Sequence, residues 1–268
     1  MTGDETGAAA AGPGATHEFE GRVVLVSGGS SGIGRATALA FARRGASVVV
    51  AGRDRPRGEE VAAACAALGA HAAFVAADLS VPDAAAKMVE RARAAFGRLD
   101  IAFNNAGIQE AAAPLAEQPD AVFEAVFGLN VRAVFLAMKA EIAAMRELGA
   151  GVIINNASVS GSRNPNGGLA LYSASKAAVL SMTRTAALEY GPAGIRINAI
   201  SPGRVDTPLM QTAAANLGLP VERIAASLPA RRVGRPEDAA EAVVWLASDA
   251  ASFVFGHDLA VDGGFLAS

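Results

Sequence analysis

Apolar and polar positions follow a repeating rhythm that begins at Phe19. Short apolar runs, rich in β-branched residues, alternate with longer alanine-rich amphipathic stretches. Continuous apolar runs are typical of strands covered on both faces, and their alternation with helices predicts a parallel sheet with right-handed crossovers. The runs predict seven strands, at 23–26, 47–51, 72–77, 101–103, 152–155, 195–200 and 259–261. The stretches predict helices over 33–44, 55–68, 83–96, 119–148, 171–190 and 237–248. The predicted fold class is therefore α/β, a doubly wound parallel sheet with helices on both faces.

Two segments lack this rhythm. Residues 1–17 are rich in Gly, Ala and Thr without periodicity, which predicts a disordered tail. Residues 204–236 contain several prolines and no strong strand, so we expect them to lie over the sheet as a lid. Neither a linker nor an internal repeat interrupts 18–268, which predicts one domain.

Composition and charge exclude several classes of protein. The 268 residues are 52% hydrophobic and 18% charged, which excludes a disordered or collagen-like chain. The formal net charge of −3 disfavours a basic face, so we expect no nucleic-acid partner. The chain shows no basic leader and no strongly apolar stretch of about 20 residues, so we expect no secretory signal and no membrane span.

Cysteine and histidine usage bears on compartment and metal binding. Cys65 is the one cysteine, which excludes an intrachain disulfide and fits a reducing compartment, so we expect the cytoplasm. The histidines, His17, His71 and His257, are scattered without metal-ligand spacing, and we expect no metal site.

A glycine-rich turn, SGGSSGIG at 27–34, follows the first predicted strand and leads into the first helix. Glycines let a backbone turn tightly and approach a pyrophosphate, while a helix N-terminus supplies free N–H groups and partial positive charge. Glycines also make ordinary tight turns, but the place of this turn between strand and helix favours dinucleotide binding.

The end of the second predicted strand bears on which dinucleotide binds. A site for NAD usually has an acidic residue about 20 positions beyond the turn, to bind the ribose 2′-OH. This chain has Gly52 there, followed by Arg53, with Arg55 and Arg57 close behind. Because a guanidinium binds a 2′-phosphate that a carboxylate would repel, we favour NADP(H), with NAD(H) possible. Alternatively, these arginines form the solvated start of a helix.

Tyr172 and Lys176 lie four positions apart on a predicted helix and so share a face. A free tyrosine has a pKa of about 10 and is a poor base near neutrality. A neighbouring ammonium favours the phenolate and lowers that pKa, as a positive nicotinamide ring would. The alternative is a surface tyrosine beside a surface lysine.

Two further polar residues are candidates for the same chemistry. Ser158 follows a predicted strand, at the edge where open α/β sheets bind ligands, and its hydroxyl can bond a substrate oxygen. Asn130 lies within a predicted helix, where asparagine is a mediocre helix former, and a buried amide can hold a water. The alternatives are a loop or cap serine and a locally satisfied asparagine.

Taken together, these motifs resemble the compact, single-domain branch of the short-chain dehydrogenase/reductase family over residues 19–268. The turn resembles TGxxxGIG, with Ser27 in place of threonine, while Gly52 departs from the acidic residue expected for NAD. The other matches are NNAG at 104–107, the set Asn130, Ser158, Tyr172 and Lys176, the segment 202–207 with Pro202, Gly203 and Thr207, and VDGG at 261–264.

The resemblance implies a Rossmann-like fold and a role for each member of that set. Tyr172 would be the general acid/base, and Lys176 would lower its pKa and bind the nicotinamide ribose. Ser158 would orient and polarise the substrate oxygen, and Asn130 would hold a water in a proton relay. The residues expected to bind the cofactor are Gly28, Ser30, Ser31, Gly32, Ile33, Gly34, Arg53, Asp78, Leu79, Asn105, Ala106, Gly107, Tyr172, Lys176, Pro202, Gly203, Val205 and Thr207.

Residues next to the motifs are expected to form the substrate pocket, and most are apolar or neutral. This favours a small uncharged alcohol or ketone, cyclic or aliphatic, over a phosphorylated sugar. We expect the Glu110 carboxylate to face water rather than a substrate hydroxyl. The residues expected to contact substrate are Gln109, Ser158, Ser160, Leu209 and Met210.

The family resemblance also bears on assembly. Helices 119–148 and 171–190 and the C-terminal segment resemble surfaces through which family members form dimers and tetramers. We therefore expect a homotetramer or a dimer, although an apolar helix face also fits the protein's own core.

Two other functions stay open. A non-catalytic NADP(H)-sensing protein is the main alternative, but such proteins usually lose the tyrosine or the lysine, and both are present. An epimerase or dehydratase on this fold typically has a larger C-terminal substrate domain than the residues after Gly203 provide.

Overall fold

The computed structural model describes residues 17–164, 167–216, 218 and 220–268, so the predicted tail, apart from residue 17, lies outside the described residues. Seven parallel strands form one sheet in the order β3-β2-β1-β4-β5-β6-β7, which confirms the predicted fold class. The strands are β1 (Val23–Ser27), β2 (Ser47–Gly52), β3 (Ala72–Ala76), β4 (Ile101–Asn104), β5 (Gly151–Asn156), β6 (Ile195–Pro202) and β7 (Asp258–Val261). The order reverses between β1 and β4, so the loops that leave these neighbouring strands diverge, and a crevice opens there.

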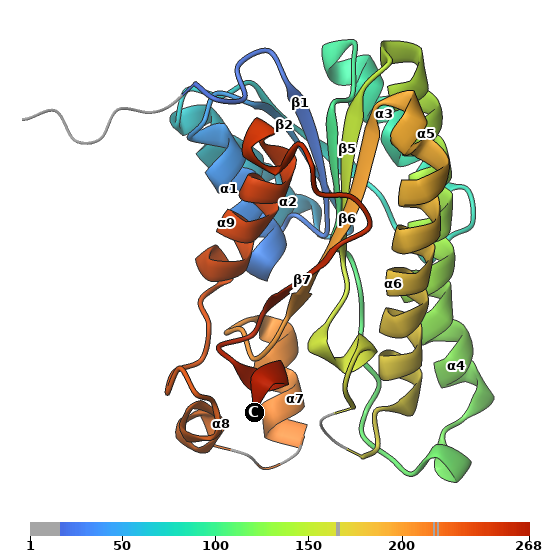
Figure 1. Cartoon of the computed structure of the whole chain (residues 1–268), viewed down its shortest axis with the longest axis vertical. Coiled ribbons are helices and arrows are strands. Elements are labelled where there is room, and N and C mark those ends of the chain that lie inside the picture. The colour runs from blue at the N-terminus through green and yellow to red at the C-terminus, as the bar shows by residue number, and fades with distance from the viewer. Residues whose placement is uncertain (1–16, 165–166, 217, 219) are drawn as a thin grey trace, which may run out of the picture.

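Helices cover both faces of the sheet (Figure 1). One face carries α1 (Gly32–Ala42), α2 (Arg55–Ala67) and α9 (Pro236–Ala247), and the other carries α3 (Ala84–Phe96), α5 (Ala133–Leu148) and α6 (Ala170–Tyr190). Successive strand residues point to opposite faces, so Val24 and Val26 belong to one core and Val23 and Leu25 to the other. Burial on both faces explains why the strands read as continuous apolar runs.

The helix predicted over 119–148 departs from a regular α-helix. It consists of α4 (Asp120–Phe127), a π-helical turn (Gly128–Arg132) and α5, with Asn130 inside the turn. π-turns break the regular hydrogen-bond ladder and occur frequently at functional sites.

The same continuous helix, Asp120–Leu148, is the one helix in the described residues that is long and apolar enough to cross a membrane, with a mean hydropathy of 1.7 over its most apolar 18 residues. Its α5 part contributes Ala137, Ile142 and Met145 to the core between the sheet and the helices α3, α5 and α6. Apolar helices that pack on a sheet meet the same criterion, so length and composition alone are weak evidence.

The segment predicted as a lid contains two short helices, α7 (Pro208–Asn216) and α8 (Val221–Ser227). They lie beyond the carboxyl ends of the strands, at the bottom of the view (Figure 1). Met210, Ala214 and Ile224 form a small apolar cluster of their own, against which Val233 packs.

Candidate active site

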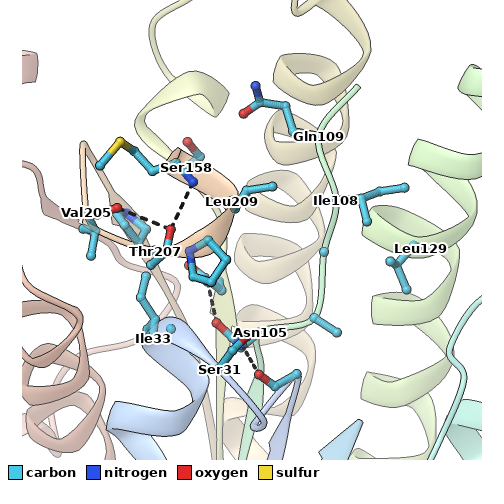
Figure 2. Close-up of a pocket in the computed structure, with 18 of the residues that line it drawn as sticks. Ser31, Ile33, Asn105, Ile108, Gln109, Leu129, Ser158, Val205, Thr207 and Leu209 are labelled. Carbon is cyan, nitrogen blue, oxygen red and sulfur yellow. Dashed lines mark hydrogen bonds between the residues drawn. The ribbon is translucent and has the colours of Figure 1, made fainter. Parts of the chain in front are cut away.

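A cleft of about 460 Å³ opens at the carboxyl ends of the strands. Its wall combines residues that follow β1, β4 and β5 with residues from the start of the α7 segment. Figure 2 shows Ser31, Ile33 and Asn105 at its lower end and Ser158 and Leu209 above them. The predicted site residues that line it are Gly28, Ser30, Ser31, Gly32, Ile33, Arg53, Leu79, Asn105, Ala106, Gly107, Gln109, Ser158, Ser160, Tyr172, Lys176, Pro202, Gly203, Val205, Thr207, Leu209 and Met210.

The glycine-rich turn forms the floor of one half of the cleft. Gly28 and Gly32 have φ angles of 62° and 51°, in the left-handed region that favours glycine. A Cβ on Gly34 would lie 2.3 Å from the Gly28 carbonyl oxygen, so the helix can approach the turn only without a side chain there. Helix α1 begins at Gly32, so the N–H groups of its first turn lie at this floor. This cradle fits the pyrophosphate of a dinucleotide.

Ser27 and Asn105 fasten the turn to the end of β4. The Ser27 hydroxyl accepts hydrogen bonds from the backbone N–H groups of Asn105 (3.0 Å) and Ala106 (3.3 Å). The Asn105 amide donates to the carbonyl oxygens of Ser27 and Gly28, each at 3.1 Å. The bonds from the N–H groups of Asn105 and Ala106 need only a hydroxyl at position 27, so serine can replace the threonine of the family pattern.

The arginines after β2 do not all face the cleft. Arg53 and Arg57 line it. Arg55 instead bonds Glu59 at 2.8 Å, so it is not part of the site. Asp54, which sequence reasoning missed, also lines the cleft and caps α2 by accepting from the backbone N–H of Arg57 at 3.1 Å. The cap holds this carboxylate at the helix start.

The opposite half of the cleft holds Ser158, Tyr172 and Lys176, which are between 5% and 9% exposed. Tyr172 and Lys176 share one face of α6, and the Lys176 Nζ lies 5.7 Å from the centre of the tyrosine ring. The Ser158 hydroxyl hydrogen-bonds the Tyr172 phenol. Lys176 Nζ donates to the carbonyl oxygen of Asn156 at 2.7 Å, which fixes the amine between the tyrosine and the end of β5.

Burial dominates the acid–base properties of these groups. It raises the pKa of Tyr172, and the Glu110 carboxylate raises it further, while the Ser158 hydrogen bond and the charge of Arg204 lower it. Burial also lowers the pKa of Lys176 to about 8. That Lys176 makes the phenol more acidic stays a prediction. Among the described residues, Ser158 and Arg204 have that effect.

Comparisons with known proteins identify the family. A family model described as enoyl-(acyl carrier protein) reductase matches residues 28–266. Cis-4-hydroxycyclohexanecarboxylate dehydrogenase of Sinomonas cyclohexanicum is 43% identical over 252 residues, which cover 93% of this chain and 98% of the relative. A short-chain dehydrogenase/reductase of Aspergillus oryzae is 41% identical over 248 residues, which cover 92% of this chain and 95% of that one. The chain belongs to the short-chain dehydrogenase/reductase family.

Other members of the family are similar in sequence and structure. The 2,5-dichloro-2,5-cyclohexadiene-1,4-diol dehydrogenase of Sphingobium indicum is 44% identical over 252 residues, 93% of this chain and 99% of the relative. The crystal structure of levodione reductase has a TM-score of 0.90 at 36% identity and covers 93% of this chain and 99% of that one.

Two solved relatives carry nicotinamide cofactors. A putative gluconate 5-dehydrogenase from Beutenbergia cavernae has bound NADP (TM-score 0.87, 40% identity, 94% of this chain and 99% of that one). A 3-ketoacyl-(acyl-carrier-protein) reductase from Brucella melitensis is complexed with NADH (TM-score 0.83, 38% identity, 91% and 98%). Relatives of this short-chain dehydrogenase/reductase thus include proteins described with either cofactor.

Three predicted residues of this short-chain dehydrogenase/reductase do not line the cleft. Gly34 lies behind the turn, where its missing side chain permits the close approach. Asp78 is exposed, and its carboxylate accepts from the hydroxyl and the backbone N–H of Ser80, at 2.7 and 3.1 Å. Asn130 is fully buried.

The side chain of Asn130 bonds the loop after β4 and helix α6, and its expected role in holding a water stays a prediction. Its amide donates to the Ile108 carbonyl oxygen (2.8 Å) and accepts from the Ile108 N–H (2.9 Å). A third bond runs to the Ser175 hydroxyl at 3.0 Å. Since Ile108 lines the cleft, Asn130 positions the wall of the site from behind.

Sequence reasoning missed Arg204 and misjudged Glu110. Arg204 lines the cleft beside Tyr172, and its place inside the recognised segment 202–207 was the available signal. The expectation that Glu110 faces water is wrong, because it is 6% exposed and accepts hydrogen bonds from the N–H groups of Leu171 and Tyr172 at 3.0 Å. Nothing in the local sequence indicates this contact.

The described residues contain no group of three His, Cys, Asp or Glu that could hold a metal ion.

Proposed function

We propose that this short-chain dehydrogenase/reductase transfers a hydride between a nicotinamide cofactor and a small, uncharged cyclic alcohol or ketone, with Tyr172 as general acid/base. The observation that carries the proposal is the convergence of Ser158, Tyr172 and Lys176 in one cleft, across from the glycine-rich turn. The apolar side chains of Ile108, Leu209 and other lining residues favour a ring without charge. The names of the relatives support a cyclic substrate.

The chain's own residues supply binding and proton transfer. The turn and the start of α1 would hold the pyrophosphate, and Lys176 would bind the nicotinamide ribose. The Ser158 hydroxyl orients the substrate oxygen, and Tyr172 gives a proton to that oxygen in reduction or takes it in oxidation. When bound, the nicotinamide cofactor would supply the hydride donor or acceptor.

The proposal is tested by following the absorbance of the reduced cofactor with a panel of cyclic and linear ketones. We expect NADPH consumption, fastest with cyclic ketones. Tight NADPH binding without turnover of any ketone would instead support the alternative of a sensor. Such a protein binds NADP(H) in response to its concentration and catalyses no reaction.

We further propose a preference for NADP(H), because Arg53 and Arg57 line the cleft beside Gly52. Arg53→Ala should weaken NADPH binding by roughly 10-fold or more and leave NADH binding nearly unchanged, since a charge-assisted phosphate contact stabilises by about 1.5–3 kcal/mol. Gly52→Asp should invert the preference, and a Cβ there meets only Ser30 atoms at 3.5 Å and beyond. Fluorescence titration with both cofactors measures the ratio, and an unchanged ratio in both variants contradicts the assignment.

A second candidate substrate is a cyclic alcohol that carries a carboxylate. Arg204 lines the same cleft as Tyr172, and its charge acts on the phenol, so a substrate carboxylate would meet a guanidinium in this cleft. In the same panel, a higher kcat/KM for 4-hydroxycyclohexanecarboxylate than for cyclohexanol, lost in Arg204→Leu, would favour this candidate. Equal values would favour the uncharged ring.

We also propose a homotetramer located in the cytoplasm. Large apolar side chains are exposed on helices that resemble family interfaces, such as Phe123 on α4, Phe135 on α5 and Leu188 on α6. Light scattering should give four times the mass of the chain, and cell fractionation tests the compartment.

A further inference from the structure

Glu110 caps the helix that carries the proposed acid/base. Its carboxylate accepts hydrogen bonds from the N–H of Leu171 at 3.0 Å and from the N–H of Tyr172 at 3.0 Å to both oxygens. These are first-turn N–H groups of α6, which have no partner within the helix. The helix takes its cap from a loop about 60 residues earlier in the chain, which follows β4.

A buried carboxylate at this place does more than satisfy two donors. Its negative charge is favourable at a helix N-terminus, where the peptide dipoles place partial positive charge. One of the two donors is the backbone of Tyr172 itself, so the cap fixes the point from which the phenol extends toward Ser158. A shift of about 1 Å at a reacting group can lower the rate roughly 100-fold, so the contact between Glu110 and the backbone of Tyr172 can strongly affect turnover.

The same loop forms part of the substrate wall. Ile108 and Gln109 line the cleft, and Ile108 is held by two hydrogen bonds to Asn130. Glu110, two residues after Ile108, accepts a hydrogen bond from the start of α6. The loop therefore connects the wall that contacts substrate with the helix that carries the proton donor.

We propose that Glu110 is a positioning residue that sets both the place and the charge environment of Tyr172. This inference rests on the proposed role of Tyr172. Three groups from three elements act on the acidity of the phenol: Ser158 after β5, Arg204 after β6 and Glu110 after β4. Lys176 on α6 lies 5.7 Å from the centre of the tyrosine ring. Glu110 and Arg204 have opposite charges, so their effects on the acidity of the phenol oppose each other.

The chain permits a direct measurement, because it contains only two tyrosines. In a Tyr190→Phe background, the near-ultraviolet absorbance change on ionisation reports Tyr172 alone. Adding Glu110→Gln keeps an oxygen acceptor for the cap but removes the charge, and should lower the titration midpoint by roughly one pH unit. The pH profile of alcohol oxidation should shift downward in the same way.

A second variant separates position from charge. Glu110→Ala removes the cap as well, and should lower kcat by roughly 10- to 100-fold with little change in the KM for the cofactor. If Glu110→Ala fails to fold, Glu110→Gln alone decides through its midpoint and pH profile. The matched control is Asp238→Asn, since Asp238 accepts from the N–H of Arg235 at 2.7 Å at the start of α9, outside this cleft. It should lower the melting temperature without moving either readout.

The outcomes distinguish this inference from the proposed function. If Tyr172→Phe is inactive while Glu110→Gln leaves the midpoint and the pH profile unchanged, Glu110 is a structural cap only and the inference is wrong. If Tyr172→Phe is as active as the unaltered enzyme, the proposed function is wrong instead.

Discussion

Tyr172→Phe should lower turnover by about 10²–10⁴-fold, the usual contribution of a positioned general acid or base. The substitution removes one oxygen atom from a side chain that is 9% exposed, so the ring still fills its place between Ser158 and Lys176. The cofactor cradle lies across the cleft at the glycine-rich turn, and cofactor affinity should therefore stay within a few-fold. Stopped-flow turnover and fluorescence titration of the cofactor measure the two quantities separately.

The matched control is Tyr190→Phe at the other end of α6, which should keep full turnover. A Tyr172→Phe enzyme with normal turnover would remove the phenol from the proton transfer. A parallel loss of cofactor affinity would instead indicate a disturbed cleft, so both measurements are needed.

Glu141→Gln should make the stability of the protein less dependent on pH between pH 5 and pH 8. Glu141 is fully buried on α5, and burial raises its pKa from 4.5 to about 7, although a hydrogen bond from Asn104 opposes this. Since the folded state binds this proton more tightly than the unfolded chain, stability falls as the pH rises from about 4.5 to 7 and stays low above that. Between pH 5 and pH 8 the loss from this carboxyl group amounts to about 2–3 kcal/mol.

A glutamine has no proton to lose, so the variant should lack this part of the pH dependence. Denaturant melts at pH 5 and pH 8 give the free energy of unfolding, and the variant should gain about 2–3 kcal/mol relative to the unaltered protein between the two. The control is Glu90→Gln on the exposed side of α3, which should show no such gain. Equal pH dependence in all three proteins would mean that Glu141 is not the responsible group.

Much of the fold follows from local patterns that burial imposes. The strands are β-branched runs covered on both faces, and the predicted segments agree with β1 to β7 to within about two residues. The glycine-rich turn and the pair Tyr172 and Lys176 were recognised because their chemistry depends on short, fixed spacings. The π-turn at Asn130 was not predicted, because a helix with one altered turn keeps nearly the same apolar pattern.

The buried carboxylates that sequence reasoning missed, Glu110 beside the site and Glu141 in the core, depend on contacts between distant segments. Glu110 and Glu141 look like ordinary acidic residues of a loop and an amphipathic helix. Glu110 is buried because α6 returns over the loop, and Glu141 because Asn104 lies at the end of a neighbouring strand and donates to it at 2.9 Å. Such pairings are set by topology, and no spacing along the chain encodes them.

The separate apolar cluster of α7 and α8 has an evolutionary consequence. Because Met210, Ala214 and Ile224 pack with one another and outside both cores of the sheet, and Met210 also lines the cleft, substitutions among them alter this side of the cleft with little effect on the scaffold. Selection can therefore change which substrates the cleft accepts, while the glycine-rich turn, Tyr172 and Lys176 stay unchanged. One conserved reaction can in this way come to act on many different substrates.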